Sequence, residues 1–206
     1  MMELFQRKLL KTKQLIMNEK EALLVIEQMI NSTKEEIKDN GFFYYMWGWL
    51  VFIAAISNAV ILHYDLLEVH SLPWIILIPL GGVITFFVSK REKQPIVKTY
   101  VSESMGIVVK AFSISLFIIC FAMPLGQQWK AFYPTIMIIY AIWLFVSGGL
   151  LKFKPLQFGG ILNWLLALVG FVWASTQLHL LLIAFGVVGG FIIPGHILKS
   201  KTNKSV

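Results

Sequence analysis

Six long apolar stretches constrain this chain more than any other feature, because each is close to the length of helix that crosses a bilayer. A hydrocarbon core of about 30 Å needs roughly 20 residues of α-helix. We therefore expect an all-α fold, a six-helix transmembrane bundle that forms one domain over residues 41–206. The stretches run over residues 42–62, 72–88, 105–123, 132–151, 158–174 and 178–198.

The composition agrees with a lipid environment. Hydrophobic residues make up 57% of the 206 residues and charged residues only 14%, whereas soluble domains carry about 25% charged residues. The net charge of +7 would suggest nucleic acid for a soluble protein. Here the cations lie near the ends of the apolar stretches, where they suit anionic headgroups. The expected partner is thus the lipid bilayer, and no nucleic acid is expected.

The distribution of cations predicts the orientation. Lys and Arg cluster before the first stretch, between the second and third, between the fourth and fifth, and after the sixth, whereas the alternate connections contain only Lys130. Loops rich in Lys and Arg stay in the cytoplasm. We therefore expect a multi-pass protein of the cell membrane with both termini cytoplasmic. The short alternate connections group the six helices into three helical hairpins.

Glycine pairs mark the even-numbered stretches near their basic ends. They are Gly81–Gly82, Gly148–Gly149 and Gly189–Gly190, and the last belongs to a GxxxG motif that begins at Gly186. Small residues let helix backbones approach closely in lipid. These glycines are therefore predicted to pack helices together, and direct contact with a ligand is the less favoured interpretation.

Residues 1–40 form a separate segment of different character. Apolar residues recur there at helical spacing among charges of both signs, which predicts a cytoplasmic amphipathic helix over Glu19–Asp39. Because its charges nearly balance, packing on a partner helix or on the bundle is favoured over purely electrostatic membrane binding. This helix is the expected contact with a protein partner, and the chain can also form a homo-oligomer.

Few polar side chains lie within the apolar stretches, and these are the candidate binding residues. Lys110 lies in the third stretch, and Glu103 is seven residues earlier on the same helix face. Lys110 either extends to the headgroups or faces the bundle and binds an anion or Glu103, and the first is favoured. Asn58 in the outer half of the first stretch and Asn163 near the inner end of the fifth are expected to make interhelical hydrogen bonds.

The outer loops carry a weaker candidate cluster, namely His63, Asp65, Glu68, His70 and His179. Imidazole and carboxylate groups bind zinc and similar ions, and histidines titrate near neutral pH. The spacing matches no defined metal site, so no metal or cofactor is predicted, and a metal or pH sensor is a remote alternative.

Enzyme signatures are missing from the sequence. It contains no GxSxG, HExxH, CxxC or P-loop motif, and Cys120 is its one cysteine. No catalytic residue is therefore predicted, and we do not expect an enzyme.

Two segments carry a resemblance. Residues 17–55 and 147–167 resemble an uncharacterised family of small bacterial six-helix membrane proteins. The resemblance implies the six-helix topology and a bacterial inner membrane, and it implies no functional residues. The favoured function is a non-enzymatic scaffold or a regulatory, accessory component of the membrane. The alternative is a small transporter or channel for a small molecule or ion.

Overall fold

The computed structural model describes residues 41–91, 100–173 and 175–203, and their regular secondary structure is entirely helical. The predicted helix over Glu19–Asp39, like the rest of residues 1–40, lies outside the described residues. Six helices are long and apolar enough to cross a membrane. The first five are a first helix Gly41–Tyr64, α2 Leu72–Arg91, α3 Tyr100–Leu125, α4 Trp129–Leu150 and α5 Lys154–Val172. The last helix has three parts, namely α6 Thr176–Val187, the π-helical segment η1 Val188–Ile192 and α7 Ile193–Asn203.

The predicted boundaries differ most at the start of two helices. α5 begins at Lys154 rather than at residue 158, because Pro155 occupies the first turn, where its missing N–H costs nothing. The preceding turn is tight, with Lys152 at a φ of 51°. α3 begins at Tyr100 rather than at residue 105, since polar residues extend the helix beyond its apolar part.

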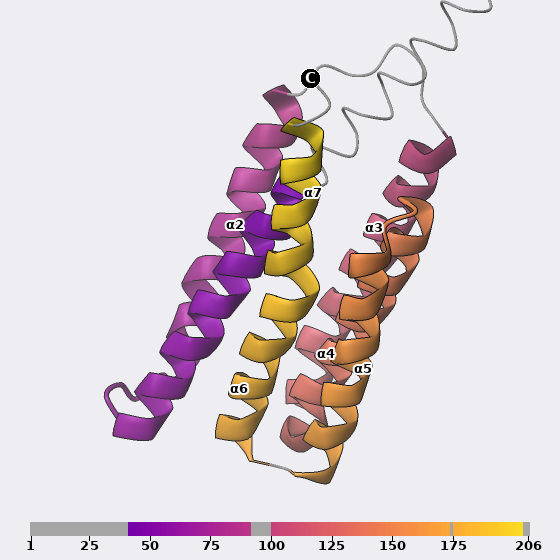
Figure 1. The fold of residues 1–206 in the computed structure, drawn as a ribbon. Coiled ribbons are helices and arrows are strands. Elements are labelled where there is room, and N and C mark those ends of the chain that lie inside the picture. The colour runs from indigo at the N-terminus through magenta and orange to yellow at the C-terminus, as the bar shows by residue number, and fades with distance from the viewer. Residues whose placement is uncertain (1–40, 92–99, 174, 204–206) are drawn as a thin grey trace, which may run out of the picture.

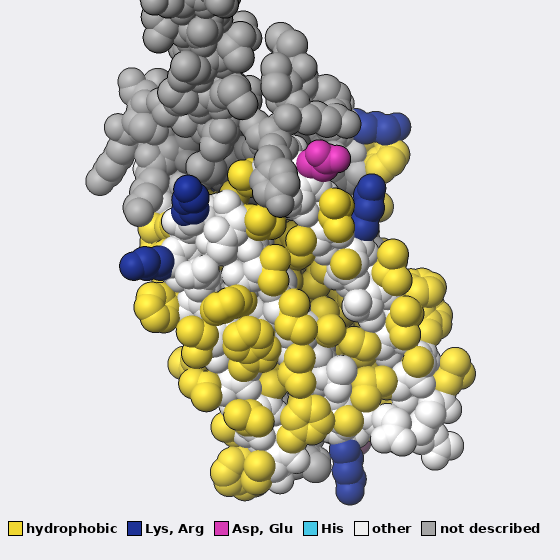
Figure 2. Space-filling model, turned by 90° about the vertical axis from the view of Figure 1, so that its right-hand side faces the viewer, with side chains coloured by type: hydrophobic (Ala, Val, Ile, Leu, Met, Phe, Trp, Pro, Cys, Tyr) yellow, Lys and Arg dark blue, Asp and Glu magenta, His cyan; other side chains and the backbone are white. Residues whose placement is uncertain are grey.

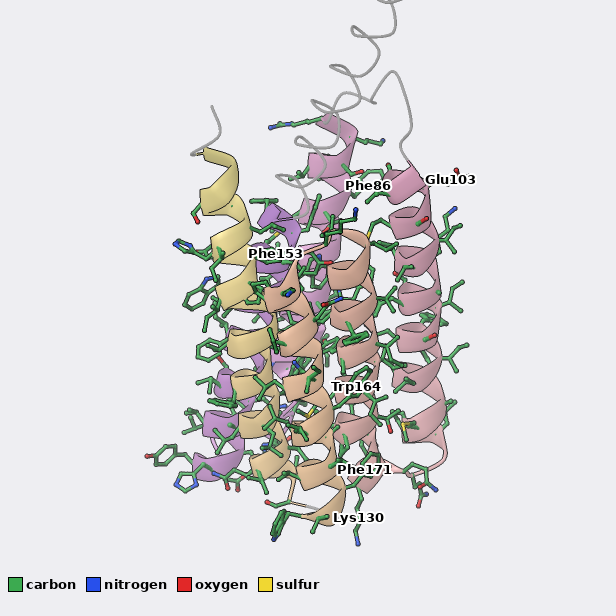
Figure 3. All side chains as sticks on the ribbon, turned by 45° about the vertical axis from the view of Figure 1, so that its right-hand side comes forward. Phe86, Glu103, Lys130, Phe153, Trp164 and Phe171 are labelled. Carbon is green, nitrogen blue, oxygen red and sulfur yellow. The ribbon has the colours of Figure 1, made fainter. Side chains whose placement is uncertain are left out.

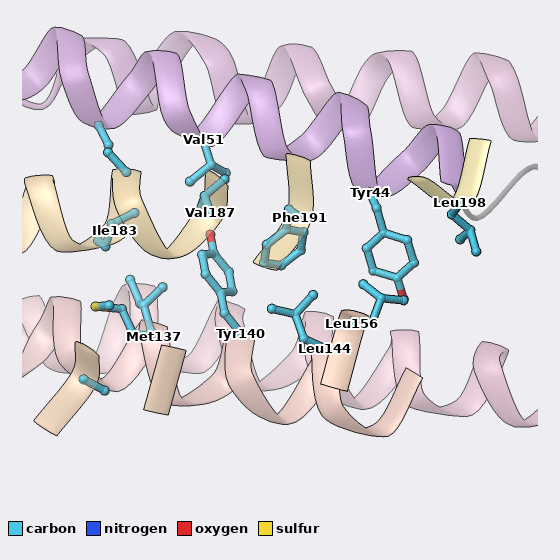
Figure 4. Close-up of a cluster of buried hydrophobic side chains, with 14 of the residues drawn as sticks. Tyr44, Val51, Met137, Tyr140, Leu144, Leu156, Ile183, Val187, Phe191 and Leu198 are labelled. Carbon is cyan, nitrogen blue, oxygen red and sulfur yellow. The ribbon is translucent and has the colours of Figure 1, made fainter. Parts of the chain in front are cut away.

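The helices divide into a central group of four and two peripheral ones. Half of the apolar stretch of the last helix is buried, against 11% for α2 and 6% for α3. The last helix lies among the first helix, α4 and α5, and α2 and α3 flank this group (Figure 1). Buried side chains from all four central helices meet in one core, which includes Val51, Tyr140, Leu144, Leu156, Val187 and Phe191 (Figure 4).

Within the part of the chain from α2 to α7, α4 and α5 pack on each other most extensively. They are joined by residues 151–153 alone. A Cβ atom on Gly148 of α4 would lie 2.8 Å from the Gln157 backbone nitrogen of α5, and one on Gly160 would lie 2.8 Å from the Ala141 carbonyl oxygen. Glycines on both helices therefore bring the two backbones together.

α5 and η1 approach each other closely through glycines. A Cβ atom on Gly159 would lie 2.5 Å from Cα of Gly190, a separation at which no side chain fits. The predicted packing role of the GxxxG glycines is thus confirmed. In the Gly81–Gly82 pair only one member has such a role, because nothing lies within 4 Å of a Cβ on Gly82.

The π-helical segment directly precedes Pro194, which is fully buried. A proline inside a helix lacks the N–H that would bond to the carbonyl four residues earlier, and its ring clashes with that carbonyl. The wider π turn over Val188–Ile192 relieves this clash. The last helix therefore crosses the core through an irregular segment and continues as α7.

Most charged side chains lie at the two ends of the bundle, and a largely apolar surface lies between them (Figure 2). The end at which α2 finishes and α3 begins carries most of the cations, and we call it the basic end (Figure 1). Its described cations are Lys90, Arg91, Lys152, Lys154 and Lys199. The opposite end holds the connections 65–71 and 126–128, the end of α5 and the start of α6, and it includes Lys130 (Figures 1 and 3).

Candidate functional site

Asn163 lies at the midpoint of α5 and is completely buried. It was expected near the inner end of the helix, and the earlier helix start at Lys154 explains the difference. Its Nδ2 donates one hydrogen bond to the carbonyl of Gly159 in its own helix at 2.9 Å and another to the carbonyl of Gly186 in α6 at 3.0 Å. The amide thus ties α5 to α6 two residues before the π-helical segment.

The other amide atom of Asn163 has no hydrogen-bond partner. Oδ1 is buried and packs against Gly186, where a Cβ atom would come within 2.6 Å of it. A Cβ on Gly190 would likewise come within 2.8 Å of Nδ2. The GxxxG glycines therefore form the recess that admits the Asn163 side chain between the two helices.

Asn58 connects the first helix to three other parts of the chain at the end opposite the basic end. With the amide oriented to match its surroundings, Nδ2 donates to the His70 carbonyl oxygen at 2.7 Å and Oδ1 accepts from the Trp74 indole N–H at 2.9 Å. The Tyr133 hydroxyl of α4 lies beside the same side chain. Asn58 is 3% exposed, so its amide group bonds to other parts of the protein and is not accessible to a ligand.

The structure does not bring the five residues of the expected outer cluster together into one site. His179 of α6 is buried, and its Nε2 donates a hydrogen bond to the Gly170 carbonyl of α5 at 2.8 Å. His63 Nδ1 lies 3.0 Å from Gln177 Nε2, and His70 Nε2 lies 3.9 Å from Asp65 Oδ1. Glu68 is exposed. Within the residues described, no group of three or more His, Cys, Asp or Glu side chains could hold a metal ion.

Lys110 and Glu103 are both exposed on α3. Neither faces the core, because α3 packs on α4 through the opposite side of the helix, where Phe112 stacks on Tyr140 at 6.0 Å between ring centroids. Figure 3 shows Glu103 near the basic end of α3, at the edge of the molecule. Lys110, Asn58 and Asn163 are therefore in three different surroundings and do not form one site.

Two polar contacts were not anticipated from the sequence. Trp47 Nε1 donates to Thr85 Oγ1 at 3.1 Å, and Thr85 Oγ1 donates to the Gly81 carbonyl at 2.8 Å, which joins the first helix to α2. Tyr44 buries its hydroxyl beside Ser147, whose own hydroxyl donates to the Trp143 carbonyl at 2.6 Å. Both contacts join residues far apart in the chain, so no local sequence pattern signals them.

No model of a known protein family, no curated protein and no solved structure matches the chain. The resemblance to small bacterial six-helix proteins therefore stays a prediction, and any function has to be argued from the residues themselves.

Proposed function

We propose that this chain is a non-enzymatic scaffold or regulatory component of a bacterial cell membrane, with both termini in the cytoplasm. Six apolar helices and the cations at the basic end support the placement and the orientation. The three-hairpin grouping belongs to the same proposal.

One observation carries the proposal. The buried asparagines and His179 use their side-chain N–H groups to bind carbonyl groups of neighbouring backbone. They thereby join helices, loops and turns to one another, as polar groups in lipid do when their role is to hold a bundle together. Such a rigid bundle suits a protein that positions a partner, and the charge-balanced Glu19–Asp39 segment supplies a surface for that partner.

A deletion experiment tests the partner surface. The full chain and a variant lacking residues 19–39 would carry the same photo-crosslinking group at the C-terminus and be compared in native membranes. We expect specific adducts from the full chain and their loss from the variant. A matched control lacks residues 2–16, which should leave the adducts in place. Adducts that persist without residues 19–39 would contradict this proposal.

The alternative of a small transporter is favoured by one feature, the unpartnered Asn163 Oδ1 beside the π-helical segment. Irregular helices near the middle of a membrane often surround binding sites in transporters. Asn163→Cys in a Cys120→Ser background separates the two functions. A scaffold predicts no reaction with a membrane-impermeant maleimide until the protein is denatured, whereas a transporter predicts rapid labelling in intact membranes.

A further inference from the structure

The exposed side of α3 carries two charges of opposite sign on one face of the helix. Glu103 and Lys110 are seven residues apart, which places them on the same side, and both are exposed. Among the helices from α2 to α7, α3 packs mainly on α4. That contact includes Phe112, which lies on the opposite side of the helix. The two charges therefore face the surroundings of the bundle.

These two charges are not paired with other groups in the described part of the chain. No ion pair forms with Glu103 or Lys110 in residues 41–91, 100–173 and 175–203. Their backbones are about 10 Å apart along the axis. Helical side chains leave Cα toward the helix N-terminus, so both side chains lean the same way and do not meet. A group outside the chain is needed to bridge them.

The surface between the two charges is open. Gly106 lies between Glu103 and Lys110 on the same face, and nothing lies within 4 Å of a Cβ placed on it. Because no side chain covers this point, a small polar group can approach the helix backbone between the cation and the anion.

The depth of the two residues matches the boundary between hydrocarbon and headgroups. The 26 residues of α3 span about 39 Å, roughly 9 Å more than the hydrocarbon core. Polar residues stand at the start of α3 and its last turn is apolar, so the excess belongs at the basic end. Glu103 then lies about 4–5 Å outside the hydrocarbon, and the Lys110 backbone about 6 Å inside it. An extended lysine side chain covers the second distance and brings its ammonium to the boundary.

We propose that Glu103 and Lys110 bind the headgroup of a phospholipid that carries a primary ammonium group, in the leaflet at the basic end. In such a lipid the phosphate lies next to the glycerol and the ammonium lies beyond it. The Lys110 ammonium donates to the phosphate, and the Glu103 carboxylate accepts from the lipid ammonium. The order of charges along α3 is thus complementary to the order of charges along the headgroup.

Other headgroups satisfy only part of this arrangement. Phosphatidylglycerol offers its phosphate to Lys110 but only neutral hydroxyls to Glu103. Phosphatidylcholine keeps the positive charge, but its methylated nitrogen has no N–H to donate to the carboxylate. The two charges therefore select phosphatidylethanolamine. This preference does not depend on a scaffold role, because it needs only that α3 crosses the bilayer.

Lipid retention measures the preference. The full chain would be reconstituted in bilayers with equal amounts of phosphatidylethanolamine, phosphatidylglycerol and phosphatidylcholine that have identical acyl chains. It would then be extracted in mild detergent, and native mass spectrometry would identify the lipids that stay bound. We expect at least fivefold more bound phosphatidylethanolamine than either other lipid. Equal retention of all three, or a preference for another headgroup, would overturn the proposal.

Charge variants assign the retention to α3. Glu103→Gln should remove the preference for phosphatidylethanolamine, and Lys110→Met should lower its retention severalfold, whereas Lys110→Arg should keep it. Lys90→Met is the matched control, because Lys90 lies at the same end on α2, a helix without acidic residues. It should leave the preference unchanged. A preference that survives Glu103→Gln would contradict the assignment and overturn the proposal.

A photo-crosslinking residue locates the bound lipid. At Ile107, which lies between the two charges, it should capture phosphatidylethanolamine at least fivefold more than at Phe87, which is exposed on α2. Gly106→Leu should reduce retention severalfold by covering the open surface, while Gly82→Leu, equally open but on α2, should not. Capture of a protein instead of lipid at Ile107 in native membranes, or retention insensitive to Gly106→Leu, would also overturn the proposal.

Discussion

The crossing of α5 with η1 and the exposed side of α3 use similar residues in opposite ways. Around Asn163, a polar side chain and nearby glycines meet the backbone of the last helix, and both amide hydrogens find acceptors within the chain. Around Lys110, a charged side chain and Gly106 face away from the bundle. A glycine and a polar residue on one helix therefore lie at a contact between helices in one region and on the exposed surface in the other.

The largest expected effect comes from adding a side chain at the inner crossing. Gly159→Leu forces atoms into the space held by Gly190, whose Cα would lie 2.5 Å from the new Cβ. We expect a loss of more than about 3 kcal/mol in unfolding free energy, measured by denaturant titration in detergent. Gly106→Leu, measured the same way, should cost little in the isolated chain. Similar losses for both variants would abolish the contrast between the two regions.

Removing the amide at the same crossing should have a smaller effect. Asn163→Ala leaves the Gly186 carbonyl without this donor and opens a small cavity. We expect a loss of about 1–3 kcal/mol in unfolding free energy. Ser113→Ala on the exposed side of α3 is the matched control and should change stability by less than about 0.5 kcal/mol. An unchanged midpoint for Asn163→Ala would mean that the hydrogen bond to α6 contributes nothing.

The contact between the first helix and α2 should be weaker still. Thr85→Val removes the hydrogen bond of 3.1 Å and keeps the side-chain shape, whereas Trp47→Phe removes it together with the indole atoms that lie next to Gly81. A double-mutant cycle on thermal stability should give a coupling of about 0.6 kcal/mol, the average found for hydrogen bonds between membrane helices. Purely additive effects would show that shape alone joins these two helices.

The smallest effect on monomer stability is expected from Lys110→Met. The side chain is exposed on α3, so we expect a change of less than about 0.5 kcal/mol in detergent. The measurement is the unfolding midpoint in the same titration. A large destabilisation would mean that Lys110 supports the fold of its own chain, which would remove the contrast with Asn163.

Hydropathy predicted the six helices well because their apolar length exceeds any alternative use in a soluble fold. Hydropathy could not predict which face of each helix is buried in the bundle. Lipid tails are as apolar as a protein core, so a membrane helix is apolar on every side and its pattern does not reveal the buried face. For this reason the interhelical bond expected for Asn163 and the outward direction favoured for Lys110 came from the chemistry of the two side chains, and the apolar pattern did not show that one is completely buried and the other exposed.

The candidate residues of the outer cluster do not form one site, and the reason is related. His179 was grouped with His63 and His70 because all three precede or follow short connections at one end of the bundle. The helix that contains His179 begins at Thr176, so its side chain is already inside the bundle and bound to Gly170. Long-range contacts such as Trp47 with Thr85 depend on how helices rotate about their axes, which a single sequence does not determine.

The central position of the last helix has a consequence for how the protein is made. The first helix, α4 and α5 all pack on a helix that the ribosome completes after them. Until it arrives, Asn163 lacks its acceptor in α6, and the glycines that meet η1 are left without their neighbour. The nascent bundle is therefore unfinished for most of its synthesis. An insertion chaperone or a quality-control protease would recognise a chain that stops before residue 176 by this open core.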